Sequence, residues 1–366
     1  MNRRDFLTAS IQVAGVAAVA GPTLVRAEGR VFDPRPGPWR TFDVTTRIEV
    51  LEPRGVSRVW VPLPGVYSDY QQTLGNRWSG NARLIQVFTD PVWEAPILYA
   101  EFADVEPAPT LEVVSRVRTR SRMVDWSRPH PVAADPAELN RWLQPTELLP
   151  TDGIVRETAE QITQGRGSDL DKTRAVYDWI LANTYREPKV RGCGVGDIKT
   201  MLETRNFGGK CGDINALFVG LLRAVGVPAR DVYGIRVAPS QFGYKSLGAS
   251  SANISKAQHC RAEVFLRDYG WVAMDPADVT KVAREETAEW LPMDHPVVAT
   301  VRPKLFGGWE GNWMAYNLAH DVALPRSRGP RLGFLMYPQA ETGEGRRDSL
   351  DPEGFRYTIS AQEVAA

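Results

Sequence analysis

The sequence lacks a charge excess, internal repeats and low-complexity tracts. Its 44 Lys+Arg residues balance its 44 Asp+Glu residues, so the overall field does not favour binding to nucleic acid or to an anionic membrane. At 366 residues the chain can form two domains, or one domain with extensions, and bury a substantial core. Its 31 glycines and 27 prolines favour many turns and short strands over a helical bundle. We therefore expect a mixed fold and no nucleic-acid partner.

Cysteine is scarce, and its count is odd. Cys193, Cys211 and Cys260 cannot all pair within one chain, so at least one thiol is free or linked to another chain. A free thiol is what a nucleophile requires. A Cys193–Cys260 disulfide stays open as an alternative.

A run of about 20 apolar residues, which a membrane-spanning helix needs, is also missing. Residues 1–29 instead predict an export signal: Arg3-Arg4 and Phe6-Leu7 precede an apolar stretch at 9–20, and Val25-Arg26-Ala27 is typical of a cleavage site. The adjacent arginines favour the twin-arginine route, and hence a periplasmic or otherwise exported protein. An uncleaved anchor is the alternative, but we expect no stable membrane span.

Alternating apolar and polar residues dominate the region after this signal. Between Thr41 and Val50, and again between Arg58 and Pro62, the alternation predicts half-buried strands. We expect strands at 41–50, 58–62, 84–89, 97–102 and 111–120. They predict an antiparallel β domain over residues 30–125, followed by a proline-rich linker at 128–131.

Helical spacing of apolar residues begins after the linker. It predicts helices at 134–143, 154–163 and 169–183, the last with Ser168 or Asp169 as its cap. We assign residues 126–290 to a catalytic core. Residues 291–366 form a β-rich C-terminal extension that ends in a strand near 354–360. The expected fold class is α+β.

Cys211 has the setting expected of a nucleophile. It follows Gly208 and Gly209, precedes Gly212, and begins a helix that ends before Gly226. The apolar residues of this helix predict one buried stripe that leaves Cys211 outside it: Ile214, Leu217, Phe218, Leu221, Leu222 and Val225.

The helix N-terminus stabilises a thiolate by only about 0.3–1 kcal/mol, so a base must supply most of the activation of Cys211. The free N–H groups of the first turn can also stabilise an oxyanion. We expect the three glycines to leave room for a substrate backbone. The alternative is that Cys211 is a small buried core residue.

His259 and Asp275 lie on the two arms of a predicted hairpin. Residues 259–266 and 271–275 alternate like strands around a turn at 267–270. The two side chains share a face if the loop has an odd length, and lie directly opposite only if pairing centres on Arg267. The turn residues favour a three-residue loop at 268–270, which sets Asp275 opposite Glu263. A longer loop or a bulge would bring His259 back into register.

The motifs around these residues resemble the transglutaminase-like superfamily of papain-type thiol enzymes. The resemblance runs through residues 177–180, 211–213 and 226–230 to His259, 262–264 and 270–276. It implies a nucleophile helix packed on a small antiparallel sheet, often with an N-terminal β domain in bacterial members. It also implies that Cys211 is the nucleophile, His259 the general base and acid, and Asp275 the group that orients it. No calcium loop of the kind D-x-[DN]-x-[DN]-G is present, and we expect no cofactor.

The expected reaction is attack by Cys211 on an amide of a peptide, protein or cell-wall substrate, through a thioester. Water would make the protein a peptidase or amidase, and an amine would make it a cross-linking transglutaminase. A non-catalytic periplasmic binding or scaffold module is the alternative from another class.

A second, weaker candidate is the aromatic segment 306–317. Its side chains Trp309, Asn312, Trp313 and Tyr316 would suit a cleft for sugar or peptide. Packing of the C-terminal extension on the core is the favoured interpretation. The nearby His320-Asp321 pair offers two metal ligands, which is too few for a site without a third, so no metal is expected.

Overall fold

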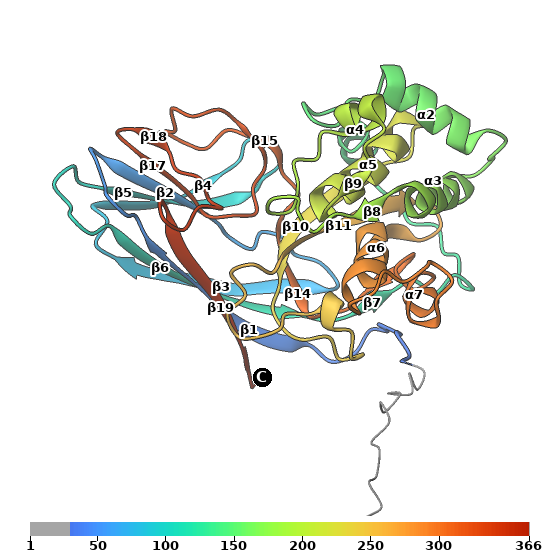
Figure 1. The fold of residues 1–366 in the computed structure, drawn as a ribbon, viewed down its shortest axis with the longest axis horizontal. Coiled ribbons are helices and arrows are strands. Elements are labelled where there is room, and N and C mark those ends of the chain that lie inside the picture. The colour runs from blue at the N-terminus through green and yellow to red at the C-terminus, as the bar shows by residue number, and fades with distance from the viewer. Residues whose placement is uncertain (1–29, 366) are drawn as a thin grey trace, which may run out of the picture.

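The computed structural model describes residues 30–365, and the predicted export signal lies outside them. Antiparallel sheets occupy one end of the molecule and most helices the other (Figure 1). The helices are α1 (Pro136–Arg141), α2 (Gly153–Thr163), α3 (Asp169–Asn183), α4 (Ile198–Thr204), α5 (Cys211–Ala224), α6 (Pro276–Glu285), α7 (Pro296–Val301) and the 3₁₀ turn η1 (Lys245–Leu247).

The strands fall into three larger sheets and several two-stranded pairs. Up to the linker they are β1 (Arg40–Glu49), β2 (Ser57–Pro62), β3 (Gln71–Gly80), β4 (Leu84–Thr89), β5 (Pro96–Phe102), β6 (Thr110–Thr119) and β7 (Arg122–Met123). In the middle they are β8 (Tyr185–Arg186), β9 (Gly208–Gly209), β10 (Ala229–Arg236), β11 (Gln258–Leu266) and β12 (Gly270–Met274). The last are β13 (Gly308–Trp309), β14 (Trp313–Asn317), β15 (His320–Val322), β16 (Leu332–Phe334), β17 (Gln339–Thr342), β18 (Gly345–Arg346) and β19 (Arg356–Val364).

Two of the sheets pack face to face and form the part of the molecule that we call the β lobe. Their strand orders are β19-β1-β6-β3 and β18-β17-β2-β5-β4. The apolar residues that alternate along β1, β2, β5 and β6 meet between them in one buried cluster, as expected for a sandwich. Strands β17 and β19 pair with β2 and β1, so the C-terminal part of the chain completes both sheets.

The third sheet, β12-β11-β10-β14, carries the candidate site. Helix α5 packs on β10 and β11, and α2, α3, α4 and α6 also contact α5. Helix α5 is therefore surrounded on all sides, and each of its 14 residues is buried. The predicted single buried stripe is wrong, because neighbouring helices cover the other faces.

Local signals explain the ends of the helices next to the site. The hydroxyl of Ser168 accepts a hydrogen bond from the Asp171 N–H at 3.1 Å and caps α3. Gly226 follows α5 with a φ of 81°, a conformation that glycine adopts without strain. Helix α6 begins with Asp275 as its N-cap and Pro276 in its first turn.

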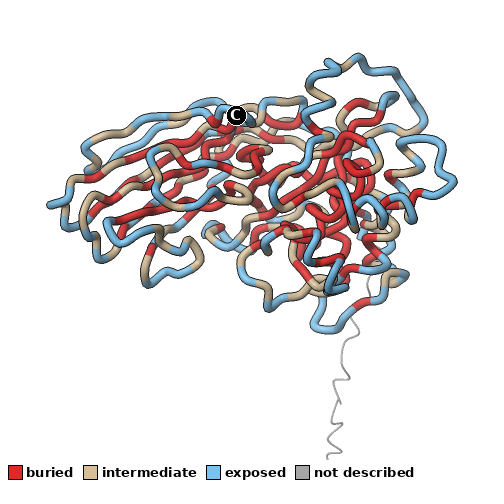
Figure 2. Tube along the Cα trace, turned by 90° about the horizontal axis from the view of Figure 1, so that it is seen from above, coloured by how far each residue is buried: buried red, intermediate tan, exposed pale blue. Residues whose placement is uncertain are grey.

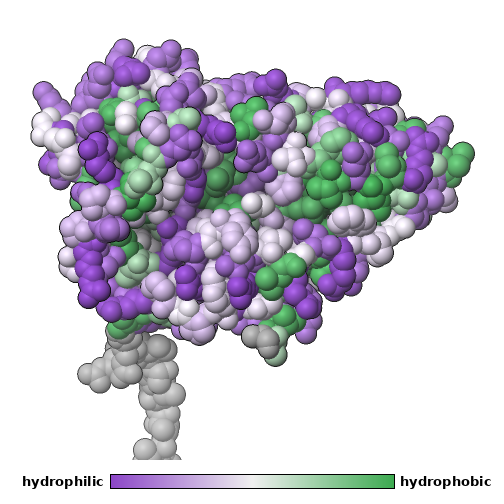
Figure 3. All heavy atoms as spheres, turned by 180° about the vertical axis from the view of Figure 1, so that it is seen from behind, coloured by the Kyte–Doolittle hydropathy of each residue, from purple (hydrophilic) through white to green (hydrophobic). Residues whose placement is uncertain are grey.

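Buried residues lie in both the sandwich and the helical part of the molecule (Figure 2). The core of the sandwich and the core around α5 are separate clusters. Seen from behind, the surface is largely hydrophilic, with hydrophobic residues gathered toward the β lobe (Figure 3). No helix within residues 30–365 is long and apolar enough to cross a membrane. The α+β prediction is confirmed by these helices and antiparallel sheets.

Candidate active site

Cys211 is the first residue of α5 and is only 2% exposed. The glycines around it make room for protein atoms. A Cβ at Gly209 would lie 2.7 Å from the Cβ of Asp213, and one at Gly212 would lie 2.7 Å from the carbonyl oxygen of Cys193. A Cβ at Gly208 would meet the ring of Tyr185. The expectation that these glycines clear space for a substrate backbone is therefore wrong.

Asp213 fixes the loop that carries Cys193 against the start of α5. One carboxylate oxygen accepts hydrogen bonds from the backbone N–H groups of Val195 and Gly196 at 2.8 and 2.9 Å. The other accepts from the Lys210 N–H at 2.9 Å. The Gly212 N–H also donates to the Cys193 carbonyl at 2.8 Å. Three backbone donors thus hold one buried carboxylate, and the thiol of Cys193 is brought toward Cys211.

The three cysteines lie together as free thiols. The sulfur atoms of Cys193, Cys211 and Cys260 lie within 4.8 Å of one another, and none forms a disulfide in the structure. The Cys193 thiol donates a 3.4 Å hydrogen bond to the Gln258 carbonyl. The sequence placed only Cys211 in a distinctive setting, whereas the fold brings all three thiols to one point.

The pKa values of the three thiols differ: that of Cys211 is lowered, whereas those of Cys193 and Cys260 are raised. The neighbouring thiols of Cys193 and Cys260 lower the pKa of Cys211 well below its usual value; burial opposes this effect, and His259 adds to it. Hydrogen bonding to Cys211 raises the pKa of Cys193, and burial raises that of Cys260. Negative charge in the cluster therefore concentrates on Cys211.

His259 lies beside Asp275 as the hairpin hypothesis requires. Its Nε2 is 2.7 Å from Asp275 Oδ2. The three-residue loop is 267–269, one residue earlier than predicted, because Gly270 pairs with Leu266 as the first residue of β12. Since Ala262 pairs with Met274, the next position of this register places Asp275 beside Arg261. His259 is two residues further along the same face, a diagonal neighbour within reach of the carboxylate.

Asp275 is fully buried, and each of its oxygens has protein partners. Oδ1 accepts hydrogen bonds from the Asp278 N–H at 3.0 Å and from Asn215 Nδ2 at 3.3 Å. The Nε of Arg261 lies 3.6 Å from Oδ2. Asn215 also donates to the Cys260 carbonyl at 2.9 Å. The orientation of Asp275 is fixed by α5, α6 and β11 together.

Asp278 is a second acidic neighbour of the imidazole that sequence reasoning missed. Its Oδ1 lies 3.3 Å from His259 Nε2, and it forms a buried ion pair with Arg236. The available signal was its spacing: a helix N-cap and the residue three positions later lie close together, and Asp278 is three positions after Asp275. Burial lowers the pKa of His259, but the charges of Asp278 and Asp275 outweigh this and raise it to about 9.

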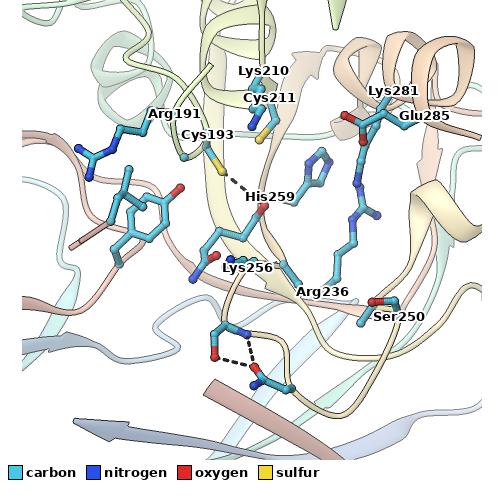
Figure 4. A pocket seen from close by; sticks show the side chains of 18 of the residues that line it. Arg191, Cys193, Lys210, Cys211, Arg236, Ser250, Lys256, His259, Lys281 and Glu285 are labelled. Atoms are coloured by element: carbon cyan, nitrogen blue, oxygen red, sulfur yellow. Dashed lines mark hydrogen bonds between the residues drawn. The ribbon is translucent and has the colours of Figure 1, made fainter. Parts of the chain in front are cut away.

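Cys211 and His259 line one cavity of about 720 Å³, while Asp275 lies behind the imidazole. Figure 4 shows the side chains of Cys193, Cys211 and His259 around a common space, with Lys281, Glu285 and Arg236 beyond His259. Both groups thus form part of the cavity wall, although each is at most 3% exposed.

The aromatic segment after Phe306 does not line this cavity. Trp309, Asn312, Trp313 and Tyr316 are each at most 4% exposed. The indole of Trp313 donates to the His259 carbonyl at 3.0 Å. This placement corrects the cleft interpretation, because the four side chains are buried in the core and Trp313 binds the backbone of β11.

His320, which the sequence pairs with Asp321 as a possible metal ligand, is buried and belongs to no group of three ligands in the part of the chain that the structure describes. Within residues 30–365 such groups are the three cysteines and the set His259, Asp275 and Asp278. His320 instead lies 3.5 Å from Asp231, and Asp321 accepts a hydrogen bond from the Glu147 N–H. The His320-Asp321 pair therefore does not form a common site.

Comparisons with known proteins place this site in a family. Residues 156–276 match the family model of the transglutaminase-like superfamily. An uncharacterised protein of Haemophilus influenzae is 33% identical over 342 residues, which cover 88% of this chain and 91% of that protein. The uncharacterised protein YebA of Bacillus subtilis is 24% identical over 244 residues, 63% of this chain but 30% of YebA. Residues 156–276 of this chain therefore form a transglutaminase-like superfamily domain.

One solved structure extends the likeness over nearly the whole chain. A proposed cysteine protease from Cytophaga hutchinsonii matches 89% of this chain and 99% of its own, with a TM-score of 0.50 and 14% sequence identity. At this identity the likeness shows the fold alone. It agrees with the expected transglutaminase-like fold.

Proposed function

We propose that the protein is a thiol-dependent amide hydrolase or acyltransferase of the cysteine-peptidase type, acting through Cys211, His259 and Asp275. The observation that carries this proposal is geometric. Two of the three groups face one cavity, and the third lies 2.7 Å behind the imidazole. This arrangement is the nucleophile, base and orienting group of a catalytic triad.

Acylation begins from a thiolate and an imidazolium. The pKa of Cys211 is lowered well below its usual value and that of His259 is raised to about 9, so at neutral pH the proton lies on His259. The thiolate attacks the amide carbonyl carbon, and His259 gives its proton to the leaving nitrogen as the C–N bond breaks. The products of this step are an amine and a thioester on Cys211.

The oxyanion of the tetrahedral intermediate needs a donor close to Cys211. The Gly212 and Asp213 N–H groups already donate to the carbonyls of Cys193 and Lys210. The N–H of Cys211 is the first of the helix and has no acceptor within it. We assign this N–H to the oxyanion, at the positive end of the α5 dipole.

Deacylation returns the enzyme to its starting state. Neutral His259 removes a proton from water, the resulting hydroxide attacks the thioester carbonyl, and the Cys211 thiolate leaves with a carboxylic acid as product. An amine in place of water would form a new amide and make the protein a cross-linking enzyme. Asp275 acts by holding the imidazole and stabilising its positive charge.

Mass spectrometry tests the proposed function. Purified protein and a Cys211→Ala variant are incubated with peptide, protein and cell-wall fractions, with and without a primary amine. Loss of a fragment with gain of water indicates hydrolysis, and incorporation of the amine indicates transfer. Absence of any Cys211-dependent product across these substrates would favour a binding or scaffold module.

The location remains part of the proposal. The twin-arginine pattern at Arg3-Arg4 supports export to the periplasm or beyond, where amides of exported proteins or of the cell wall would be the accessible substrates.

A further inference from the structure

The cavity at Cys211 has an unusual charge for a chain whose total charge is balanced. Its lining includes one acidic side chain, Glu285, against seven cationic ones. These are Arg186, Arg191, Lys210, Arg236, Lys245, Lys256 and Lys281. The excess of six positive charges lies around the nucleophile and the base.

The three arginines of this set already have acidic partners. Arg186 pairs with Glu285 at 2.8 Å, Arg191 with Asp348, and Arg236 with Asp278. Their charges are neutralised within the protein, and two of the three acids lie outside the lining. The arginines therefore contribute less to the field inside the cavity than their number suggests.

The four lysines have no such partners. Ion pairs of lysine within residues 30–365 involve only Lys172, Lys199 and Lys304. The chain has eight lysines, and half of them line this one cavity without an ion-pair partner: Lys210, Lys245, Lys256 and Lys281. Lys210 and Lys281 are half-buried, whereas Lys245 and Lys256 are exposed at the edge of the cavity. All four surround a concave site, where the field is focused.

Of the four lysines, Lys281 is the one we expect to bind an anion most strongly. It lies on α6, is half-buried, and faces the cavity from the same side as Arg236 and Glu285 (Figure 4). Burial, followed by the charge of Arg236, lowers the pKa of Lys281 to about 8. An unpaired ammonium in this position gains most from an anion that enters the cavity.

We propose that the acyl donor is an acidic peptide, whose carboxylate groups flank the attacked amide and bind Lys281, Lys256 and the other unpaired lysines of the cavity. This inference rests on the proposed function for its choice of a peptide. The lysines select the substrate and position its amide, while Cys211 and His259 carry the chemistry. Lysine suits this role because its flexible ammonium can reach carboxylates at several positions.

Alkylation of Cys211 by an anionic and by a neutral reagent tests whether the cavity attracts negative charge. Iodoacetate is anionic and iodoacetamide is neutral, and both attack the same sulfur. The ratio of their rates at Cys211, read by peptide mapping at low salt, is compared with the ratio for the same peptide in denaturant. We expect the native ratio to be higher by about tenfold or more, and to fall with added salt.

Matched variants test whether the cavity lysines cause the higher ratio of the two alkylation rates. Lys281→Gln and Lys256→Gln should each lower the ratio at least about twofold, by removing one unpaired charge. Lys199→Gln is the control, since it removes a charge from an exposed position of α4 outside the cavity lining. An equal ratio in native and denatured protein, or equal effects of all three variants, would overturn the proposal.

Binding to the inactive Cys211→Ala variant separates this inference from the proposed function. Calorimetry compares a pentapeptide carrying two glutamates with its glutamine counterpart. We expect the acidic peptide to bind at least about tenfold more tightly, with the difference reduced at least about twofold in the Cys211→Ala, Lys281→Gln double variant. An unreactive Cys211 with this preference intact would refute the catalytic proposal alone. A reactive Cys211 without the preference would refute only the acidic substrate.

Discussion

Asp278 Oδ1 lies 3.3 Å from His259 Nε2, so the imidazole that faces Cys211 has a second carboxylate behind it in addition to Asp275. The two acids differ in their other partners. Asp275 caps α6 and contacts Asn215, whereas Asp278 is paired with Arg236. Their removal should therefore have different consequences.

Substitution of Asp275 should remove most of the activity. In Asp275→Asn the amide can donate to Nε2 and so favour the wrong state of the imidazole. We expect kcat to fall by about 10²–10⁴-fold, the range that general acid–base catalysis contributes. The measurement is the turnover rate of any Cys211-dependent substrate. Near-normal alkylation of Cys211 in the variant shows that the protein is still folded. A fall of less than threefold would show that Asp275 does not orient His259.

Substitution of Asp278 should change the pH dependence. Activity requires protonated His259 for leaving-group departure, so it should decline as pH rises through the pKa of about 9. Burial lowers that pKa, and the charge of Asp278 is the largest opposing influence. In Asp278→Asn the alkaline limb should move to lower pH by about 1–3 units.

The matched control for this shift is Asp268→Asn, an exposed acid in the hairpin loop. Its pH–rate profile should match that of the parent protein. If the alkaline limb of Asp278→Asn stays in place, the second carboxylate does not raise the pKa of His259.

The loop that carries Cys193 should depend on Gly194. This residue has a φ of 92°, and a Cβ would lie 1.8 Å from Asp213 Oδ2. We expect Gly194→Ala to lower the free energy of unfolding by about 1–3 kcal/mol. Gly165→Ala is the control: its φ is 74° with nothing within 4 Å. Equal losses in denaturant titrations would mean that contact with Asp213 adds nothing to the backbone strain.

Export should require both arginines of the predicted signal. Replacement of Arg3 and Arg4 by lysine should retain the protein in the cytoplasm, because the twin-arginine route reads this pair, while Arg26→Lys should be exported normally. Fractionation followed by immunoblotting measures the distribution. Undiminished export of the double-lysine variant would point to the general secretory route.

Much of the fold follows from local patterns. The spacing predicted the ends of α2 to within one residue and both ends of α3 correctly, since both segments carry clear helical periodicity. Strand β3 was missed because its burial does not alternate and most of it is exposed. Helix α6 was missed because Asp275 was assigned to a strand end, although Asp followed by Pro is a helix-start signal.

The site was only partly accessible to sequence reasoning. Cys211, His259 and Asp275 could be selected by motif, but their geometry depended on a loop position that the turn residues mispredicted by one. The thiol cluster joins a loop, a helix start and a strand that lie far apart in sequence. The unpaired lysines of the cavity are likewise scattered, so tertiary structure alone reveals them as a group.

The most direct test of the central claim is the pH dependence of Cys211 alkylation by iodoacetamide, read by peptide mapping with Cys193 and Cys260 as internal references. We expect Cys211 to react first, with its half-maximal rate at a pH well below that of an ordinary thiol, and His259→Ala to move this midpoint upward. A midpoint at about pH 8.5 or above, as for an ordinary thiol, or equal rates for all three cysteines, would contradict an activated nucleophile.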